Sequence, residues 1–377
     1  MKSIIPVCEP TLKGNELRYV TECVKSGWIS SSGRFIQKFE EKFSEYCGAS
    51  RGISCSSGTA ALHIAIESMG IGKGDEVIIP TFTMIASCNA VIYSGAKPVL
   101  VDSELETWNM DIDKIEERIN DKTKAIMAVH TYGHPVDIDK LKKISDKYGI
   151  PIIEDAAEAH GAEYKGRKTG SLGNIACFSF YANKIITSGE GGMVVTNNEK
   201  WAENARSLRS HFFGEPRFLH KKLGYNYRMT NIQAAIGLAQ LEKIDEYIAA
   251  RRNNARLYNK MLMNIKGIKN PPEAKWAKNV YWMYGILVEK EFGIGVPKLR
   301  EDLSKKGIDT RTFFIGMHKQ PAYKGEDERF PDTSGSYPVS DYLEKNGFYL
   351  PSSSHLTKEE IGRIVDAIKN IKEHKNG

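Results

Sequence analysis

The sequence lacks the features of several common protein classes. Its six cysteines are scattered without a C-x-x-C pair, and no histidine cluster has the spacing of zinc ligands. We therefore expect free thiols in a reducing cytosol and no metal site. Charged residues make up 27% of the 377 residues and the net charge is +6, but no block of lysines and arginines occurs. A nucleic-acid partner is accordingly not expected.

No apolar run approaches the roughly 18 residues of a membrane-spanning helix. The N-terminal stretch MKSIIPVCEPTLKGNE also lacks the apolar core of a signal peptide. We expect a cytoplasmic protein without a membrane partner. With 41% hydrophobic residues the chain can form a sizeable core, and its length predicts two domains or one large domain with an appendage.

From residue 51 onward, short apolar runs alternate with amphipathic segments, which predicts alternating strands and helices. Strands are expected at RGISCSS, DEVIIP, KPVLVDS, TKAIMAVH and IPIIEDAA. Helices are expected at GTAALHIAIESMG, TMIASCNAVIYSG, DIDKIEERI and DIDKLKKISDKYG. Strands that are apolar throughout and separated by helices belong in a parallel sheet covered on both faces. This part of the chain is predicted to be an α/β domain.

The pattern changes after GGMVVTN. A long helical segment at 230–262 is expected to bridge two domains, because its apolar residues recur at helical intervals. A strand at 281–288, a helix at 298–307 and a last helix opened by Thr357 and Glu360, which have capping-box spacing, indicate a smaller α+β region. We assign residues 1–250 to a large α/β domain and residues 251–377 to a small C-terminal α+β domain.

Residues just after the strands matter most, because ligands of open α/β sheets bind beyond the carboxyl ends of the strands. Ser56, Ser57, Gly58 and Thr59 open a helix directly after a strand. Free N–H groups and the positive end of the helix dipole can hold a phosphate there. The same residues would also serve as an ordinary helix N-cap. The P-loop pattern G-x-x-x-x-G-K-[ST] does not occur.

The apolar run IPII leads directly into Glu154 and Asp155, which are followed by Glu158 and His160. A carboxylate at the end of a buried strand needs a cationic or hydrogen-bonding partner. Asp155 could equally cap a helix or pair with a nearby lysine or arginine. His160 is expected to be a packed, hydrogen-bonded side chain and not a catalyst.

Lys184 follows the next strand, with SFYAN before it and SGEGG after it. An amine, a buried carboxylate and a phosphate seat at one edge of a sheet are the three groups that hold pyridoxal 5'-phosphate (PLP). The amine forms the Schiff base, the carboxylate keeps the pyridine nitrogen protonated, and the N–H groups hold the phosphate. Each signal is weak alone, but their combination is specific.

These segments resemble the nucleotide-sugar aminotransferases of the DegT/DnrJ/StrS type. That family consists of PLP-dependent enzymes with the aspartate aminotransferase fold (fold type I), which has a large domain with a mostly parallel sheet and a smaller C-terminal α+β domain. The resemblance covers nearly the whole chain. It is carried, in order, by GWISSSGRFIQKFEEKF, SSGTAALHIA, GDEVIIPTFT, VHTYGHPVDID, IIEDAAEAHGAEYKG, FSFYANKIITSGEGGMVVTN and GYNYRMTNIQAAIGLAQLEK.

The resemblance implies that Lys184 and Asp155 are catalytic, as the Schiff-base lysine and the partner of the pyridine nitrogen. Met84 would cover the cofactor ring, where relatives usually carry an aromatic residue. Asn226 would reach the phosphate in the neighbouring subunit, which implies a homodimer with shared active sites. The full set of implied cofactor-binding residues is Ser57, Gly58, Thr59, Met84, Asp155, Glu158, Ser179, Lys184 and Asn226.

The resemblance further implies amino transfer from L-glutamate to C4 of a 4-keto-6-deoxy nucleotide sugar for a surface polysaccharide. GDP-4-keto-6-deoxy-D-mannose is favoured by similarity, and a UDP- or dTDP-4-keto-6-deoxyglucose is the main alternative. His318 would enter the sugar pocket beside Arg311 and Tyr323, although Gly316 replaces a usual proline. Trp28 and Ser30 would line the substrate entrance, but Trp28 could also be a core residue.

Two other functions are alternatives to amino transfer. A PLP-dependent sugar dehydratase of the same family would carry a histidine in place of Lys184, so the lysine argues against dehydration. A non-catalytic regulator that binds a nucleotide or sugar would not need Lys184 and Asp155 together.

Overall fold

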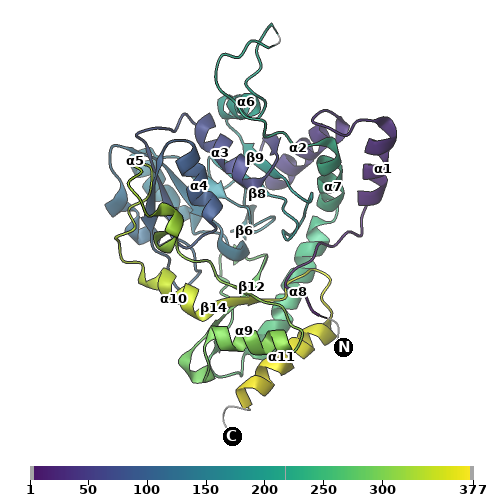
Figure 1. Cartoon of the computed structure of the whole chain (residues 1–377), viewed down its shortest axis with the longest axis vertical. Coiled ribbons are helices and arrows are strands. Elements are labelled where there is room, and N and C mark those ends of the chain that lie inside the picture. The colour runs from purple at the N-terminus through teal and green to yellow at the C-terminus, as the bar shows by residue number, and fades with distance from the viewer. Residues whose placement is uncertain (1–3, 217, 374–377) are drawn as a thin grey trace.

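A seven-stranded sheet forms the centre of the larger region of the protein (Figure 1). The computed structural model describes residues 4–216 and 218–373; residues 1–3, 217 and 374–377 of the two predicted domains lie outside the described residues. β9 is antiparallel to both of its neighbours, and the remaining strand pairs are parallel. The predicted, mostly parallel sheet is therefore confirmed. Its strands in spatial order are β1 (Arg51–Cys55), β9 (Gly192–Thr196), β8 (Ile175–Ser179), β5 (Ile152–Asp155), β4 (Thr123–Val129), β2 (Glu76–Pro80) and β3 (Lys97–Val101).

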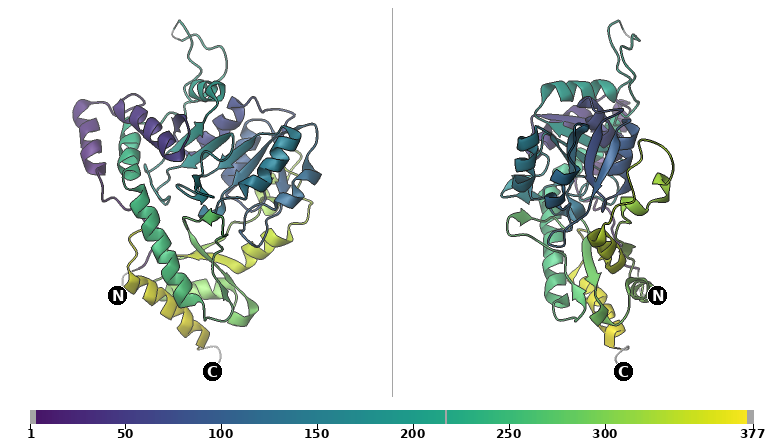
Figure 2. Two further views of the ribbon diagram at one scale, coloured as in Figure 1. Left: turned by 180° about the vertical axis from the view of Figure 1, so that it is seen from behind. Right: turned by 90° about the vertical axis from the view of Figure 1, so that its left-hand side faces the viewer.

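Helices cover both faces of this sheet (Figure 2). Adjacent strand residues point to opposite faces, so Ile153 packs in one core with residues of α3, α4 and α6, whereas Ile152 packs in another core with residues of α5. Helices α2 and α7 cover the part of the second face formed by β8 and β9. The bounds are α2 (Arg34–Cys47), α3 (Gly58–Ser68), α4 (Ile85–Tyr93), α5 (Ile138–Tyr148), α6 (Glu199–Leu208) and α7 (Asn231–Leu241).

A second, antiparallel sheet of four strands lies in the C-terminal region (Figure 1). Residues of α8, α9 and α11 pack with it in one core. Thr357 and Glu360 form the predicted capping box, because each backbone N–H bonds the other side chain at 2.9 and 3.1 Å. The elements are β10 (Ile268–Lys269), β12 (Tyr284–Val288), β14 (Gly347–Leu350), β13 (Arg311–Thr312), α8 (Ile244–Leu262), α9 (Val296–Lys305), α10 (Pro338–Asn346) and α11 (Lys358–Glu373).

Smaller elements tie the two regions together. A three-stranded sheet joins β11 (Ala277–Lys278) to β6 (Glu163–Tyr164) and β7 (Arg167–Lys168). Ile5 forms a bridge with Ile308, so the start of the chain lies beside the C-terminal region, before α1 (Glu16–Ser26) returns to the large sheet side. The predicted domain boundary at residue 250 falls inside α8 and stays a prediction.

Two predicted helices differ from the structure. The single helix expected at 230–262 is divided into α7 and α8 at Glu242 and Lys243, where the Lys243 N–H bonds the Gln240 carbonyl in a tighter turn. The break lets α7 pack on α1 and α2 while α8 continues to the second sheet. The segment 111–119 forms only two short 3-10 helices, because Asp111 caps a turn and the segment is too short for a stable α-helix.

The segment between α6 and α7 projects from the body of the protein (Figures 1 and 2). It carries exposed apolar side chains, among them Leu223 at 92% exposure. All six cysteines are free thiols. No helix in the described ranges has the length and apolar character needed to cross a bilayer.

Candidate active site

The three predicted strand exits meet at one cavity of about 350 Å³. This volume lies within the range of small-molecule sites. The cavity brings together the start of α3, the end of β5 and the segment after β8, as parallel strands place their carboxyl ends at one edge. Of the residues predicted to bind a cofactor, it is lined by Ser57, Gly58, Thr59, Met84, Asp155, Glu158, Ser179 and Lys184.

The start of α3 offers backbone donors to the cavity. Ser57 caps the helix, because its Oγ accepts a hydrogen bond of 3.1 Å from the Ala60 N–H. Gly58 and Thr59 follow as the first helical residues, whose N–H groups have no acceptor within a helix. A Cβ on Gly58 would lie 2.7 Å from the Cβ of Ser179, so glycine allows the close approach of α3 to β8. The segment is therefore both a helix cap and a possible anion seat.

Glu154 and Asp155 point to opposite faces of the sheet. Glu154 is fully buried, and His130 Nε2 lies 3.1 Å from its Oε2. Its oxygens also accept hydrogen bonds of 2.6–2.9 Å from the backbone N–H groups of Gly170, Leu172 and Gly173. These donors satisfy the carboxylate within the protein, so Glu154 holds the 170–173 turn against β5.

Asp155 is buried beside the cavity with fewer partners. Its Oδ2 accepts a hydrogen bond of 2.7 Å from the Ser87 hydroxyl, and its Oδ1 accepts one of 3.2 Å from the Ala157 N–H. Burial raises the pKa of this carboxyl, while the two hydrogen bonds and the charge of Lys184 oppose the shift. No lysine or arginine in the described ranges forms an ion pair with Asp155. A cation in contact with Asp155 would give this carboxylate a direct ionic partner.

Lys184 and Glu158 complete the charged part of the cavity. Burial lowers the pKa of the Lys184 amine, and the carboxylates of Glu158 and Asp155 partly restore it. Burial also raises the pKa of Glu158 to about 7, while Lys184 and the Tyr132 N–H, 2.8 Å from Glu158 Oε2, act in the opposite direction. A lysine with a lowered pKa is more readily present as the neutral, nucleophilic amine.

Met84 lies on the cavity wall with 48% of its surface exposed, and its sulfur accepts a hydrogen bond of 3.0 Å from the Ala86 N–H. The remaining lining contains residues that we did not predict. Asn183 and Glu190 flank Lys184 in the chain, so their position was accessible from the sequence. Five more lie within three residues of a predicted site residue: Leu62, Thr83, Ala86, Ala157 and Tyr181. The remaining four come from other elements and have no local signal: Val129, Trp282, Phe314 and Tyr349.

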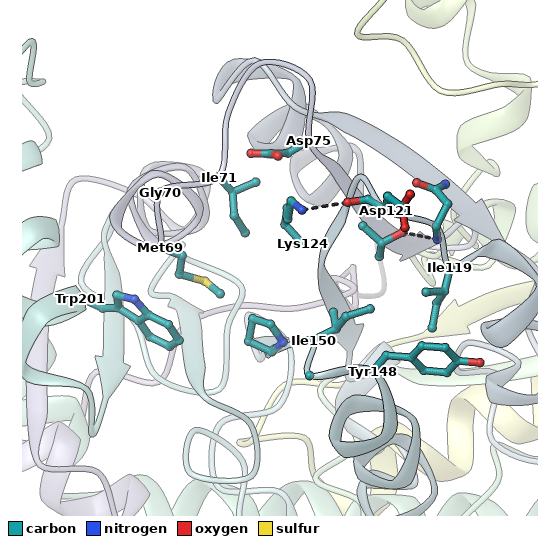
Figure 3. Close-up of a pocket in the computed structure, with 14 residues that line it drawn as sticks. Met69, Gly70, Ile71, Asp75, Ile119, Asp121, Lys124, Tyr148, Ile150 and Trp201 are labelled. Atoms are coloured by element: carbon teal, nitrogen blue, oxygen red, sulfur yellow. Dashed lines mark hydrogen bonds between the residues drawn. The ribbon is translucent and has the colours of Figure 1, made fainter.

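A larger hollow, of about 740 Å³, lies at the opposite edge of the sheet. Figure 3 shows the residues that line it. Met69, Tyr148 and Trp201 are among its lining residues. Its lysine, Lys124, donates a hydrogen bond of 2.9 Å to the carbonyl of Asp121. Because it lies at the amino ends of β4 and β5 and has no buried acid facing a lysine, its size alone does not make it the reactive site.

The sequence profile of the DegT/DnrJ/EryC1/StrS aminotransferase family matches residues 10–369. The chain belongs to this family. It is 44% identical over 372 residues to the GDP-perosamine synthase of Caulobacter vibrioides and 43% identical over 376 residues to that of Escherichia coli O157:H7, with 97% of this chain and 98% of each relative covered. Spr1654 of Streptococcus pneumoniae, solved in a PLP form, superposes with a TM-score of 0.91 at 28% identity and covers 99% of both chains.

Five residues of this aminotransferase that were predicted to bind substrate do not line the cavity: Trp28, Ser30, Arg311, His318 and Tyr323. Trp28 and Ser30 lie in the exposed loop between α1 and α2, where their carbonyls accept hydrogen bonds from Asn231 at 2.7 and 2.6 Å. Trp28 is 59% exposed, so it is not a core residue. Its role at a substrate entrance stays a prediction.

The other three substrate candidates are occupied by contacts within the chain. His318 lies with Nδ1 2.8 Å from Thr81 Oγ1 and Nε2 3.1 Å from Asp341 Oδ1. Arg311 pairs with Asp309 at 2.8 Å. Tyr323 is buried, and its hydroxyl donates a hydrogen bond of 2.8 Å to the Asn89 side chain. Their roles in sugar binding stay predictions.

Asn226 is exposed on the segment that leads into α7 and does not line the cavity of its own chain. Its Oδ1 accepts hydrogen bonds from Arg228 at 2.8 and 3.0 Å. His160 is buried among the rings of Phe43, Phe178 and Phe180, as its predicted packing requires. Burial lowers the pKa of His160 to about 3, and an interaction with the Ser179 backbone opposes that shift, so its predicted hydrogen bond stays a prediction.

Proposed function

We propose that the protein is a PLP-dependent aminotransferase that moves an amino group from L-glutamate to C4 of a 4-keto-6-deoxy nucleotide sugar. The favoured acceptor is GDP-4-keto-6-deoxy-D-mannose, which would give GDP-perosamine for an O-antigen or similar surface polysaccharide. The single observation that carries the reaction type is the cavity shared by Lys184, Asp155 and the start of α3. The acceptor rests on the full-length similarity to the GDP-perosamine synthases.

The residues around the cavity fit PLP. The direct partners of the buried Asp155 carboxylate are a hydroxyl and an N–H group, both neutral, so a protonated pyridine would balance its charge. The N–H groups of Gly58 and Thr59, together with the Ser179 hydroxyl, suit a phosphate. When bound, PLP withdraws electrons from the carbon that carries the amino group.

The charged side chains divide the remaining tasks. Lys184 would bond the cofactor's aldehyde and, when released, hold or deliver the proton at the carbon beside the nitrogen. Its lowered pKa favours the neutral amine that both tasks need. Glu158, with a pKa of about 7, can share a proton with a ring hydroxyl near neutral pH. Asp155 must stay ionised, and a cation at the ring nitrogen would lower its pKa toward that state.

We include a cytoplasmic homodimer with shared active sites in the proposal. Asn226 is exposed and lies away from the cavity of its own chain, which suits a side chain that serves a second copy. The projecting segment between α6 and α7 exposes Leu223 beside it in the chain, and an exposed apolar side chain on a protrusion is suited to burial against a partner.

Product mass separates the candidate acceptors. The enzyme is incubated with PLP, ¹⁵N-labelled L-glutamate and one of GDP-4-keto-6-deoxy-D-mannose, UDP-4-keto-6-deoxyglucose or dTDP-4-keto-6-deoxyglucose. We expect the ¹⁵N label in the GDP sugar, and NMR should show that this nitrogen is bonded to C4. If product forms only from the UDP or the dTDP sugar, that sugar is the acceptor in place of the GDP sugar. A label at C3 would show that the amino group is transferred to C3 and not to C4. Loss of a hydroxyl without nitrogen transfer would indicate a dehydratase, and a colourless, inactive protein would indicate a regulator.

A further inference from the structure

Trp282 places an aromatic ring directly against the amine of the predicted catalytic lysine. The Nζ of Lys184 lies 3.7 Å from the centre of the indole ring. Trp282 is 4% exposed and comes from the segment just before β12, in the C-terminal region of the chain. Tryptophan is the strongest partner for a cation over a ring face, and the interaction grows when water is excluded.

The indole is fixed from several sides. Its Nε1 donates a hydrogen bond of 2.8 Å to the carbonyl of Asn183, the residue before Lys184. The carbonyl of Trp282 accepts a hydrogen bond of 2.7 Å from Arg251, which is 3% exposed and also binds the Ser352 carbonyl at 2.7 Å. Tyr132 stacks on the indole at 6.3 Å. A ring held in this way presents one face to the amine at a defined position.

The amine takes this position although two carboxylates share the cavity. In the described part of the chain, Lys184 forms no ion pair with Asp155 or Glu158. An ion pair with either acid would occupy the group that we assign to the pyridine nitrogen or to the ring hydroxyl. The indole therefore gives the ammonium a partner that leaves both acids available.

We propose that Trp282 is a positioning residue whose indole face holds the amine of Lys184 at the edge of the cavity whenever that amine is not bonded to cofactor. The inference rests on the proposed function, because it assigns a place to the amine that the reaction releases. Trp282 acts through Lys184, whose amine is the reacting group that its indole contacts.

The charged surroundings of Lys184 set the direction of the expected effect. The indole favours the ammonium form, as do the carboxylates of Glu158, which follows β5, and Asp155, which ends it, and Cys8 from the N-terminal segment. Burial favours the neutral amine, and the buried His160 nearby has a strongly lowered pKa, so it adds no positive charge. Loss of the indole face alone should therefore lower the pKa of Lys184.

The first test measures that pKa without turnover. Full-length protein is freed of cofactor, mixed briefly with PLP over a range of pH, and reduced with borohydride, and the modified fraction of Lys184 is read by peptide mass. The pH midpoint of modification reports the deprotonation of the amine. Trp282→Phe and Trp282→Leu are compared because they differ mainly in the ring face. We expect the midpoint of the leucine variant about one unit below that of the phenylalanine variant, roughly a tenfold change.

A second measurement keeps the shape of the site. Fluorinated tryptophan, incorporated throughout the chain, weakens the negative ring face while the side chain keeps its size. The midpoint of Lys184 should move to lower pH in this protein. The control is the Trp282→Phe variant produced with the same fluorinated tryptophan. In this variant the fluorinated rings lie elsewhere in the chain, and none lies over Lys184. Its midpoint should not move.

The outcomes separate this inference from the proposed function. Equal midpoints for the leucine and phenylalanine variants, or no shift on fluorination, would overturn the role of Trp282. If the leucine variant does not fold, the fluorinated protein decides. Absence of any modification at Lys184 in the unaltered protein would instead overturn the proposed function.

Discussion

Two adjacent carboxylates at the end of β5 have different surroundings and should respond differently to substitution. Glu154→Gln replaces one carboxylate oxygen by an amide NH₂ that faces at least one of the backbone N–H donors, so we expect the free energy of unfolding to fall by about 2–4 kcal/mol. Asp155→Asn removes a buried charge with only neutral direct partners, so stability should be unchanged or higher while PLP binding weakens at least about tenfold. Urea unfolding and a PLP titration measure both. Equal stability losses would contradict the assignment.

Glu158 should make stability depend on pH. Its carboxyl has a pKa of about 7 in the folded protein against 4.5 in the unfolded chain. Between these values the folded state holds a proton that the unfolded state has lost, so rising pH destabilises the protein. Glu158→Gln has no carboxyl to titrate, so this destabilisation is absent from the variant. Above pH 7 the variant should be more stable than the unaltered, cofactor-free protein by on the order of 3 kcal/mol, and the difference should vanish near pH 4. Denaturant unfolding of both proteins at pH 4 and above pH 7 measures this difference in unfolding free energy. The same difference at both pH values would contradict the prediction.

Single residues also show how far the sequence could be interpreted. Asp155, Lys184 and Gly58 were accessible because each lies at or shortly after the carboxyl end of an apolar strand, and the edge rule for parallel sheets brings such residues together. Ser87 and Trp282 were not assigned, because their contacts with Asp155 and Lys184 depend on how α4 and the C-terminal region pack. No local pattern contains that information.

Among the elements, the start of α3 is the part whose geometry can be tested most simply. Gly58→Ala should weaken PLP binding, because the new Cβ would lie 2.7 Å from the Ser179 Cβ and push α3 away from β8. Gly362→Ala in α11 is the matched control: it has no atom within 4 Å and should stabilise the protein by about 0.5–1 kcal/mol. A PLP titration and thermal unfolding of both variants measure the difference. Unchanged affinity for Gly58→Ala would exclude this segment as the phosphate seat.

The predicted elements were most accurate for strands that are buried on both faces of the sheet. Apolar strands such as β2 and β4 have a core on each face, so their sequence is unambiguous. The segments 111–119 and 230–262 have apolar residues at helical intervals, but this periodicity does not predict where a helix ends. There the end is set by tertiary packing, since α7 lies on α1 and α2 whereas α8 reaches the second sheet.

For the whole molecule, shared active sites predict complementation between inactive variants. Lys184→Ala and Asn226→Ala should each be inactive or nearly so as homodimers. After the two are unfolded together and refolded, each mixed dimer has one site with both native residues, so activity should return to about a quarter of the unaltered level. Glutamate-dependent product formation before and after mixing is the measurement. No recovery in a sample with proven mixed dimers would show that Asn226 does not serve the neighbouring site.

The central claim is that Lys184 and Asp155 hold PLP in the cavity between the α3 start and the end of β5. The most direct measurement is borohydride reduction of the protein after incubation with PLP, followed by peptide mass analysis. We predict loss of the yellow colour and a pyridoxyl group on Lys184 alone, with neither colour nor turnover in Lys184→Ala. A pyridoxyl group on another lysine, or normal amino transfer by Lys184→Ala, would contradict the account.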